Sequence, residues 1–169
     1  SLFLFRGIQL YRVHCIVLPP GLVPLKHLIT NTKLRRQWWA RRAGPRPVRS
    51  IMYNENDYWS NRYSSGGDSG AGSYGDEAEF KRSILIREFK ASRCESILDL
   101  GCGDGNLIFP ILDQLNPSEY LGIDIAQPVI QRHNSSPPSP VSSFKKSDIQ
   151  GFFDPMDMVI MMDVLFHLN

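Results

Sequence analysis

The stretch that decides the fold is SILDLGCGDGNL, residues 96–107, in which an apolar run is followed at once by closely spaced glycines. The run SILDL is typical of a short buried strand, and Gly101, Gly103 and Gly105 predict a tight turn after it. Glycines at the end of a strand let the backbone approach a ligand closely, because they adopt dihedral angles that are closed to other residues. The stretch therefore predicts a ligand-binding turn at the carboxyl end of a strand.

Helical and strand-like segments alternate along the rest of the chain. The expected elements are a helix from Asp76 to about Ala91, a strand over 96–100, a helix over 108–115, a strand over 120–125, a short helix from Pro128, a weak strand near Phe144 and a buried strand over 157–162. The last of these is a continuous apolar run, which is typical of a strand buried on both faces. The alternation predicts an α/β layer of parallel strands joined by right-handed crossovers.

A glycine- and serine-rich segment precedes the first predicted helix. Residues 61–75, NRYSSGGDSGAGSYG, hold five glycines and predict a loop rather than the interior of a helix or strand. Asp76 follows this segment and Glu79 comes three residues later, which predicts a capping box. We therefore expect the loop to end at Asp76, directly before the helix.

Acidic side chains mark the ends of the predicted strands. Asp99, Asp124, Asp148 and Asp163 all fall at or just after such an end. Parallel strands end at one edge of their sheet, and ligands of these sheets bind beyond that edge. We therefore expect several carboxylates to surround one ligand site.

Three classes of ligand use a glycine turn of this kind. A phosphate-binding loop needs Gly-Lys-Ser/Thr at its end, whereas Asn106 and Leu107 stand there. A dinucleotide site needs GxGxxG, and the third glycine comes one residue early, at Gly105, which disfavours this class without excluding it. The third class is S-adenosyl-L-methionine, whose positively charged sulfonium and ammonium groups favour nearby carboxylates.

Four motifs then follow one another in the order and at the separations of one enzyme family. ILDLGCGDGNL (97–107), YLGIDIA (120–126), KSDI (146–149) and DMVIMMDVLFHL (157–168) resemble successive motifs of the class I S-adenosylmethionine-dependent methyltransferases. The segment 58–81 resembles a loop and helix that cover the cofactor in one subgroup. The resemblance spans about residues 53–169 and implies a Rossmann-like, doubly wound, mostly parallel sheet. It also implies methyl transfer to an acceptor that the sequence does not identify.

The resemblance implies a set of cofactor-binding residues, namely Asp99, Gly101, Cys102, Gly103, Gly105, Asn106, Asp124, Ile125, Asp148, Ile149, Asp163 and Tyr74. Asp124 would accept hydrogen bonds from the ribose hydroxyls, and Asp148 would meet the adenine amino group. Asp163 and His167 follow the fourth strand, where the family contacts the methionine part or the substrate, and His167 is the candidate catalytic base. Structural roles stay open for Asp148 as a turn residue, for Cys102 as a buried filler and for His167.

Charge divides the chain sharply. Residues 1–50 hold ten Lys or Arg and no Asp or Glu, whereas residues 51–169 hold nine Lys or Arg against 17 acidic residues. We therefore expect a basic, poorly ordered or irregular N-terminal extension, followed by the N-terminal part of a methyltransferase domain, with Met52 as a candidate start. An Arg-rich extension can also be an organelle transit peptide or, with Trp38 and Trp39, an arm that touches nucleic acid.

The cysteine and apolar patterns exclude several other classes. Cys15, Cys94 and Cys102 are scattered and odd in number, so neither a disulfide framework nor a metal site is predicted. This usage favours a reducing, cytoplasmic location, with an organelle as the alternative if the extension is a transit peptide. The apolar stretches near the N-terminus are interrupted by Arg6 and Arg12, and none reaches the length of a membrane span.

The family's sheet has seven strands, and this chain ends after the fourth. We therefore expect a C-terminally truncated fragment that binds cofactor weakly and shows no turnover. Residues 157–162 would then form an exposed apolar edge, which is a site of aggregation.

Two alternatives stand beside methyl transfer. An NAD(P)-binding oxidoreductase would need the glycine turn to hold a pyrophosphate. A non-enzymatic nucleic-acid-binding module would depend on the basic residues 26–49, and its binding would fall steeply with added salt.

Overall fold

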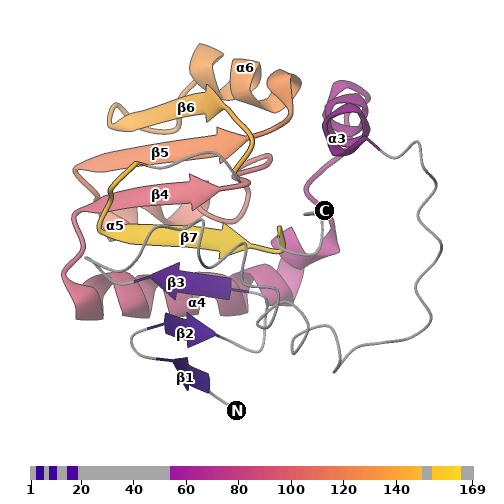
Figure 1. Ribbon diagram of the computed structural model, residues 1–169. Coiled ribbons are helices and arrows are strands. Elements are labelled where there is room, and N and C mark those ends of the chain that lie inside the picture. The colour runs from indigo at the N-terminus through magenta and orange to yellow at the C-terminus, as the bar shows by residue number, and fades with distance from the viewer. Residues whose placement is uncertain (1–2, 6–7, 11–14, 19–53, 150–153, 165–169) are drawn as a thin grey trace.

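Four parallel strands form one side of a sheet that has seven strands in the described part of the chain (Figure 1). The computed structural model describes residues 3–5, 8–10, 15–18, 54–149 and 154–164. The four strands are β4 (Ser96–Leu100), β5 (Glu119–Asp124), β6 (Ser142–Lys146) and β7 (Met158–Met162), in the spatial order β7-β4-β5-β6. All three pairings are parallel, so the predicted Rossmann-like α/β arrangement is confirmed.

The register of β4 with its two neighbours brings the strand ends together at one edge. Ile97 lies opposite Tyr120 of β5 and Met158 of β7, and two residues later Asp99 lies opposite Gly122. The apolar side chains of β4 and β5 are almost completely buried, as their continuous apolar runs predict. The carboxyl ends of β4, β5 and β7 consequently form one rim, and the candidate acids lie along it.

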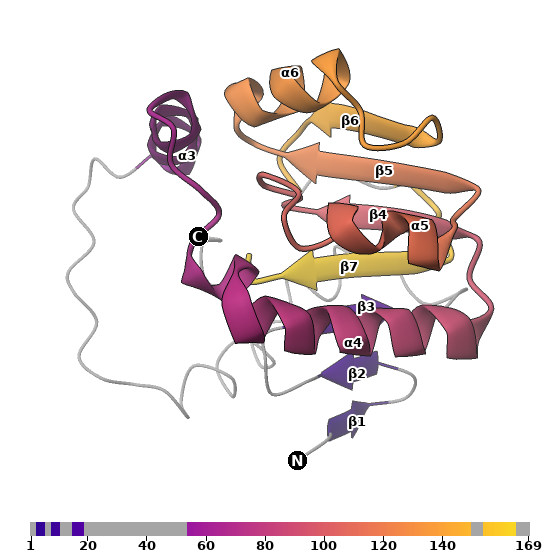
Figure 2. The same cartoon turned by 180° about the vertical axis from the view of Figure 1, so that it is seen from behind.

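Helices α4 (Gly75–Ser92) and α5 (Leu112–Leu115) lie on one face of the sheet (Figure 2). The buried side of α4 is an apolar stripe that includes Leu85 and Phe89. Helix α6 (Gln127–Ser135) packs against β5 and β6. None of the described helices is long and apolar enough to cross a membrane.

A further helix, α3 (Glu55–Ser64), stands beyond the carboxyl ends of the strands (Figure 1). The side chain of Asn54 caps it by accepting a hydrogen bond from the amide of Asp57 at 3.3 Å. The sequence predicted a loop over 61–75, and this was wrong for its first four residues, which form the last turn of α3. The rest is a loop that contains a 3₁₀ turn, η1 (Ala71–Ser73), and ends where α4 begins.

The start of α4 also differs from the prediction. The helix begins at Gly75, one residue earlier than expected, and Tyr74 is its N-cap without a side-chain hydrogen bond. The predicted capping box of Asp76 and Glu79 was therefore wrong. Asp76 lies within the first turn, where a negative charge is favourable, and Glu79 forms an ion pair with Arg82 instead.

The helix predicted over 108–115 is broken into two short pieces. A 3₁₀ turn, η2 (Phe109–Ile111), is followed by the single turn of α5, which ends at Asn116 in a left-handed conformation. Pro110 lies in the middle of η2 and has no amide hydrogen, so it cannot donate to a regular helical ladder. The apolar spacing thus predicted correctly which side chains are buried, but the continuous α-helix that it predicted was wrong.

Three short antiparallel strands extend the sheet on the side of β7. They are β1 (Phe3–Phe5), β2 (Ile8–Leu10) and β3 (Cys15–Leu18), and β3 pairs with β7. The sequence analysis predicted an irregular extension here and did not predict these strands. The expectation of an exposed edge at 157–162 was wrong, because β7 lies between β3 and β4. The division of the chain at residue 50 stays a prediction, and the basic cluster 26–49 lies outside the described residues.

The C-terminus of α4 provides a test of this fold by stability. Arg93 follows the helix with φ +52°, a left-handed conformation that strains every residue with a Cβ. We expect Arg93→Gly to raise the free energy of unfolding by about 0.5–1 kcal/mol in a urea titration of the whole chain.

The matched control is Arg87→Gly, the same substitution at an exposed position inside α4. There glycine lowers the free energy of unfolding by about 1 kcal/mol, because it weakens the interior of a helix. If both substitutions changed the free energy of unfolding in the same direction, the left-handed geometry at residue 93 would be contradicted.

Candidate functional site

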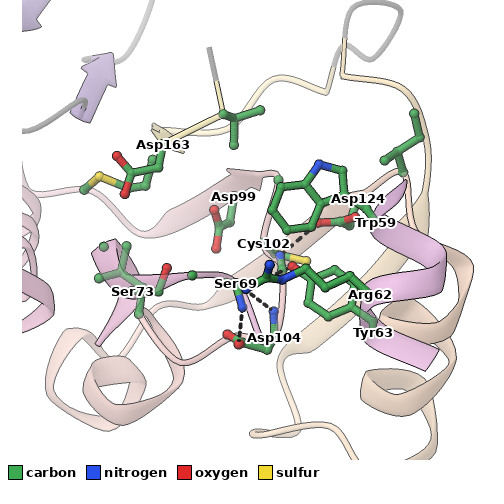
Figure 3. Close-up of a pocket in the computed structure, with 18 of the residues that line it drawn as sticks. Trp59, Arg62, Tyr63, Ser69, Ser73, Asp99, Cys102, Asp104, Asp124 and Asp163 are labelled. Atoms are coloured by element: carbon green, nitrogen blue, oxygen red, sulfur yellow. Dashed lines mark hydrogen bonds between the residues drawn. The ribbon is translucent and has the colours of Figure 1, made fainter. Parts of the chain in front are cut away.

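A pocket of about 410 Å³ opens at the carboxyl ends of the parallel strands (Figure 3). Its walls come from α3, from the loop between α3 and α4, from the glycine turn after β4 and from the residues that follow β5, β6 and β7. Pockets of ~300–1,000 Å³ are typical of small-molecule sites, and a crevice at this edge is the usual ligand site of parallel α/β sheets. The position and the size therefore both identify this pocket as the candidate site.

The glycine turn forms the floor of the pocket. Gly101, Gly103 and Gly105 have φ values of +79°, +54° and +78°. A Cβ at Gly103 would lie 2.3 Å from the Ser69 hydroxyl oxygen, and a Cβ at Gly105 would lie 2.1 Å from the Phe109 ring. Both the backbone conformation and the lack of space therefore require glycine at these positions.

The carboxylate of Asp124 joins the end of β5 to this turn. Its Oδ2 accepts a hydrogen bond from the amide of Gly103 at 3.0 Å, and its Oδ1 accepts one from the amide of Ala126 at 2.8 Å. Burial raises the pKa of Asp124 above its ordinary value, although these backbone hydrogen bonds oppose the rise. The buried carboxyl group of Asp124 therefore lies against the glycine turn, at the point where β4 and β5 end.

Asp99 is a second buried acid of the pocket, and it lies within β4. Its Oδ2 accepts a hydrogen bond from the hydroxyl of Tyr120 at 2.7 Å. Burial raises the pKa of Asp99 to about 7, the hydrogen bond from Tyr120 lowers it, and the charge of Asp124 raises it. Asp99 therefore changes its charge near neutral pH, unlike an exposed aspartate.

Asp104 fastens the loop between α3 and α4 to the glycine turn (Figure 3). Its Oδ2 accepts hydrogen bonds from the amide of Ser69 at 2.8 Å and from the hydroxyl of Tyr74 at 2.6 Å. The amide of Asp104 in turn donates to the hydroxyl of Ser69 at 2.9 Å, and that hydroxyl lies 3.1 Å from the hydroxyl of Tyr63. Burial raises the pKa of Asp104, but the hydrogen bonds from Tyr74, Asn106 and Ser69 outweigh it and lower the pKa overall.

An aromatic side of the pocket is provided by α3. The rings of Trp59 and Tyr63 stack with their centroids 5.7 Å apart, and the guanidinium carbon of Arg62 lies 5.8 Å from the centroid of Trp59. Arg62 also forms an ion pair with Asp68 of the following loop at 2.7 Å. The side chains of α3 are thus held in place by one another and by the loop that Asp104 fastens.

A half-buried ion pair lies where β7 meets the same loop. Lys81 of α4 is almost completely buried, forms an ion pair with Asp163 and donates a hydrogen bond to the carbonyl oxygen of Gly72 at 2.6 Å. Asp163 follows β7 with φ +54°, which turns the chain at the rim. Lys81 therefore joins the helix, the end of β7 and the loop at one point.

Most of the sequence-predicted site residues line this one pocket. Those that line it are Asp99, Gly101, Cys102, Gly103, Asp124, Ile125, Asp148, Ile149 and Asp163. Gly105, Asn106 and Tyr74 do not: Gly105 packs on Phe109, the side-chain amide of Asn106 donates to the carbonyl of Ser73, and Tyr74 donates to Asp104. The candidate base His167 lies outside the described residues.

Several residues that build the pocket were not named individually from the sequence, although they lie in the segment 58–81 that the resemblance places over the cofactor. Trp59, Arg62 and Ser69 come from the helix and loop before the sheet, and Lys81 supports the pocket from α4. A signal for the helix was present, because Asn54 stands directly before a segment with Glu and Asp in its first turn. Nothing comparable in the sequence pairs Lys81 with an acid that lies 82 residues further along the chain.

The pocket is strongly acidic. Its lining carboxyl groups are those of Glu55, Glu77, Asp99, Asp104, Asp124, Asp148 and Asp163, and among the described residues the lining holds one Arg and no Lys. This set favours a ligand that carries positive charge. Within the described ranges, no three His, Cys, Asp or Glu side chains are grouped so that they could hold a metal ion.

Comparison with known proteins gives one match to a family model and several similar solved structures. Residues 98–169 match the family model described as a methyltransferase domain. Among solved structures, the chain is similar to the plantazolicin methyltransferase BpumL in complex with SAH (TM-score 0.40, 19% identity, 77% of this chain and 46% of that chain). It is also similar to the methyltransferase domain of bacterial CtHen1 (TM-score 0.36, 20% identity, 42% of each chain) and to DesVI of Streptomyces venezuelae (TM-score 0.38, 13% identity, 61% and 39%). The chain spans less than half the length of these solved chains, and no curated protein matches it.

The attachment of the loop to the glycine turn can be tested with Tyr74→Phe, which removes one donor to Asp104. We expect amide hydrogen exchange at Ser69 to become about threefold to tenfold faster, since a net hydrogen bond contributes ~0.5–1.5 kcal/mol. The control is Ser83→Ala, which removes an exposed hydroxyl that donates to the carbonyl of Phe80 within α4, and it leaves the exchange at Ser69 unchanged. Equal exchange rates at Ser69 in Tyr74→Phe and in the unaltered chain would contradict this role of Asp104.

Proposed function

We propose that this chain, whose residues 98–169 belong to the methyltransferase domain family, holds the cofactor-binding half of an S-adenosylmethionine-dependent methyltransferase. One observation carries the proposal. Two strand-end acids, Asp99 and Asp124, flank a glycine turn in one pocket at the carboxyl edge of a parallel sheet, and Asp124 is bonded to the turn itself.

The chemistry of the pocket fits this cofactor. S-adenosylmethionine carries positive charge on its sulfonium and ammonium groups, and the pocket lining is dominated by carboxylates. Asp124 would hold the ribose hydroxyls, because it lines the pocket and the backbone amides that it accepts leave part of its carboxylate lone pairs for a ligand. Asp148 and the buried Ile149 would hold the adenine, and they line the pocket after β6.

When it is bound, the cofactor supplies a methyl group that is already activated by the positive sulfur. The protein then has to fix the orientation of the reacting partners and keep water away. In this chain the glycine turn and Asp124 fix the floor of the site, and the loop held by Asp104 covers one side of it. Trp59 and Tyr63 add an apolar wall, which excludes water from the pocket.

The acceptor of the methyl group is not assigned, because the chain covers less than half of the related solved chains. His167 as a base that removes a proton from the acceptor stays a prediction. The oxidoreductase and nucleic-acid alternatives gain no support from the comparisons, and the methyltransferase remains the function that the pocket supports best.

Binding of the product S-adenosylhomocysteine to the whole chain tests the proposal. We expect a single site in titration calorimetry, and a loss of affinity of about tenfold or more in Asp124→Ala, because hydrogen bonds to a charged group contribute ~1.5–3 kcal/mol. The matched control is Asp113→Ala on the exposed face of α5, which leaves binding unchanged.

NAD is titrated in parallel, because it would bind to a dinucleotide site. Binding of NAD without S-adenosylhomocysteine, or equal binding of S-adenosylhomocysteine to the Asp124→Ala and unaltered chains, would refute the proposed function. A thermal unfolding curve of each variant shows that the altered chain is still folded.

A further inference from the structure

The hydroxyl of Tyr120 lies against the carboxylate of Asp99, below the glycine turn. The two oxygens are 2.7 Å apart, and both side chains are buried: Tyr120 is 0% exposed and Asp99 is 4% exposed. Asp99 lines the pocket, whereas Tyr120 does not. Tyr120 therefore acts on any ligand only through the acid that it touches.

The register of the sheet explains how a side chain of β5 reaches this acid. Side chains alternate between the two faces of a strand, so Tyr120 and Gly122 share a face, as do Ile97 and Asp99 of β4. Gly122 lies directly opposite Asp99 and has no side chain. A Cβ at Gly122 would lie 2.7 Å from the ring of Phe144, which occupies this space. The residue of β5 that contacts Asp99 is therefore Tyr120, two residues before Gly122.

The ring of Tyr120 is held by its neighbours. Phe109 packs against it at 6.2 Å between centroids with an interplanar angle of 79°, and Phe144 packs at 5.8 Å and 60°. Both contacts are edge-to-face arrangements of the favourable kind. The hydroxyl consequently has a fixed position, and its hydrogen bond to Asp99 exists before any ligand binds.

We propose that Tyr120 is a positioning residue of the cofactor site: its hydroxyl orients Asp99 and favours the ionised form of the acid, so that the carboxylate can receive a positively charged group in the pocket. This inference rests on the proposed function for the identity of the ligand. The contact between Tyr120 and Asp99, however, belongs to the unliganded chain and can be tested there.

The charges around Asp99 show why one hydroxyl matters. From β5, Tyr120 donates a hydrogen bond, which lowers the pKa of Asp99, and Asp124 raises it through its negative charge. From the glycine turn, Cys102 is a neutral thiol, since burial raises its pKa well above the ordinary value. β7 places the apolar Ile160 opposite Asp99, and Lys81 of α4 is engaged with Asp163 at the end of β7.

The direction of the pH effect follows from these contacts. Burial is the largest influence and raises the pKa of Asp99 to about 7. A ligand with positive charge binds more tightly to the ionised acid, so its affinity rises as the pH rises through this value. Removal of the hydroxyl takes away a contact that favours the ionised form, so the rise in affinity moves to higher pH.

The test is the pH dependence of S-adenosylhomocysteine binding to the whole chain, measured by calorimetry from about pH 5.5 to about pH 9. We expect Tyr120→Phe to shift the midpoint of the rise upward by roughly one pH unit, to weaken binding about threefold to tenfold at neutral pH, and to bind almost normally at the alkaline end. The control is Ser83→Ala, which removes an exposed hydroxyl on α4 outside the pocket and leaves the profile unchanged.

A second measurement separates this inference from the proposed function. The carboxyl carbon of Asp99 is titrated by NMR in the unliganded chain, and Tyr120→Phe is expected to raise its midpoint. Absence of S-adenosylhomocysteine binding at every pH would refute the proposed function, while the NMR titration would still decide the role of Tyr120. An unchanged titration of Asp99 in Tyr120→Phe would overturn the inference.

A third variant keeps the test open if Tyr120→Phe does not fold. Fluorotyrosine at position 120 keeps the size of the ring and makes the hydroxyl a stronger donor. The midpoint of Asp99 is then expected to move downward, opposite to its shift in the phenylalanine variant. A midpoint that stays in place or moves upward would overturn the role of Tyr120.

Discussion

The carboxylate of Asp124 is the side-chain contact on which the site depends, because it joins the glycine turn to the start of α6 and adds to the backbone hydrogen bonds from Gly101 and Cys102 to Ile123. Its oxygens accept the amide of Gly103 from the glycine turn and the amide of Ala126 before α6. The left-handed turn is thereby fixed to the end of the neighbouring strand. An acid that already holds the turn is also in place to hold a ligand that lies across it, and structural and binding roles coincide in one side chain.

The loop between α3 and α4 is attached to the glycine turn and to the end of β7 through polar contacts. Asp104 fixes Ser69 and Tyr74, and Lys81 fixes the carbonyl of Gly72 and the side chain of Asp163. The loop is therefore positioned by these polar contacts. Helix α3 in addition packs against α6 and places Tyr63 in the apolar core, so polar and apolar contacts together hold the wall of the pocket.

The sequence correctly predicted the helices and strands that depend on residues close together in the chain or on a regular spacing of apolar residues. The strand 96–100 and the buried run near residue 160 were recognised because apolar residues are continuous there. The break in the helix after the turn was missed because the prediction followed the apolar residues and gave no weight to Pro110, which cannot donate a backbone hydrogen bond. The pairing of Tyr120 with Asp99 and the strands before residue 19 could not be predicted, because each depends on contacts that form only when the sheet is assembled.

The pairing of β3 with β7 has a consequence for how the chain folds during synthesis. β3 precedes its partner β7 by about 140 residues in the chain. At ~5–20 residues per second, β3 waits many seconds before the strand that it pairs with is made. Closing so long a loop is also slow, because its entropy is lost before the pairing contributes. Among the neighbouring strands that the structure describes, β3 and β7 are the pair most distant in sequence, and the seam between them therefore forms late.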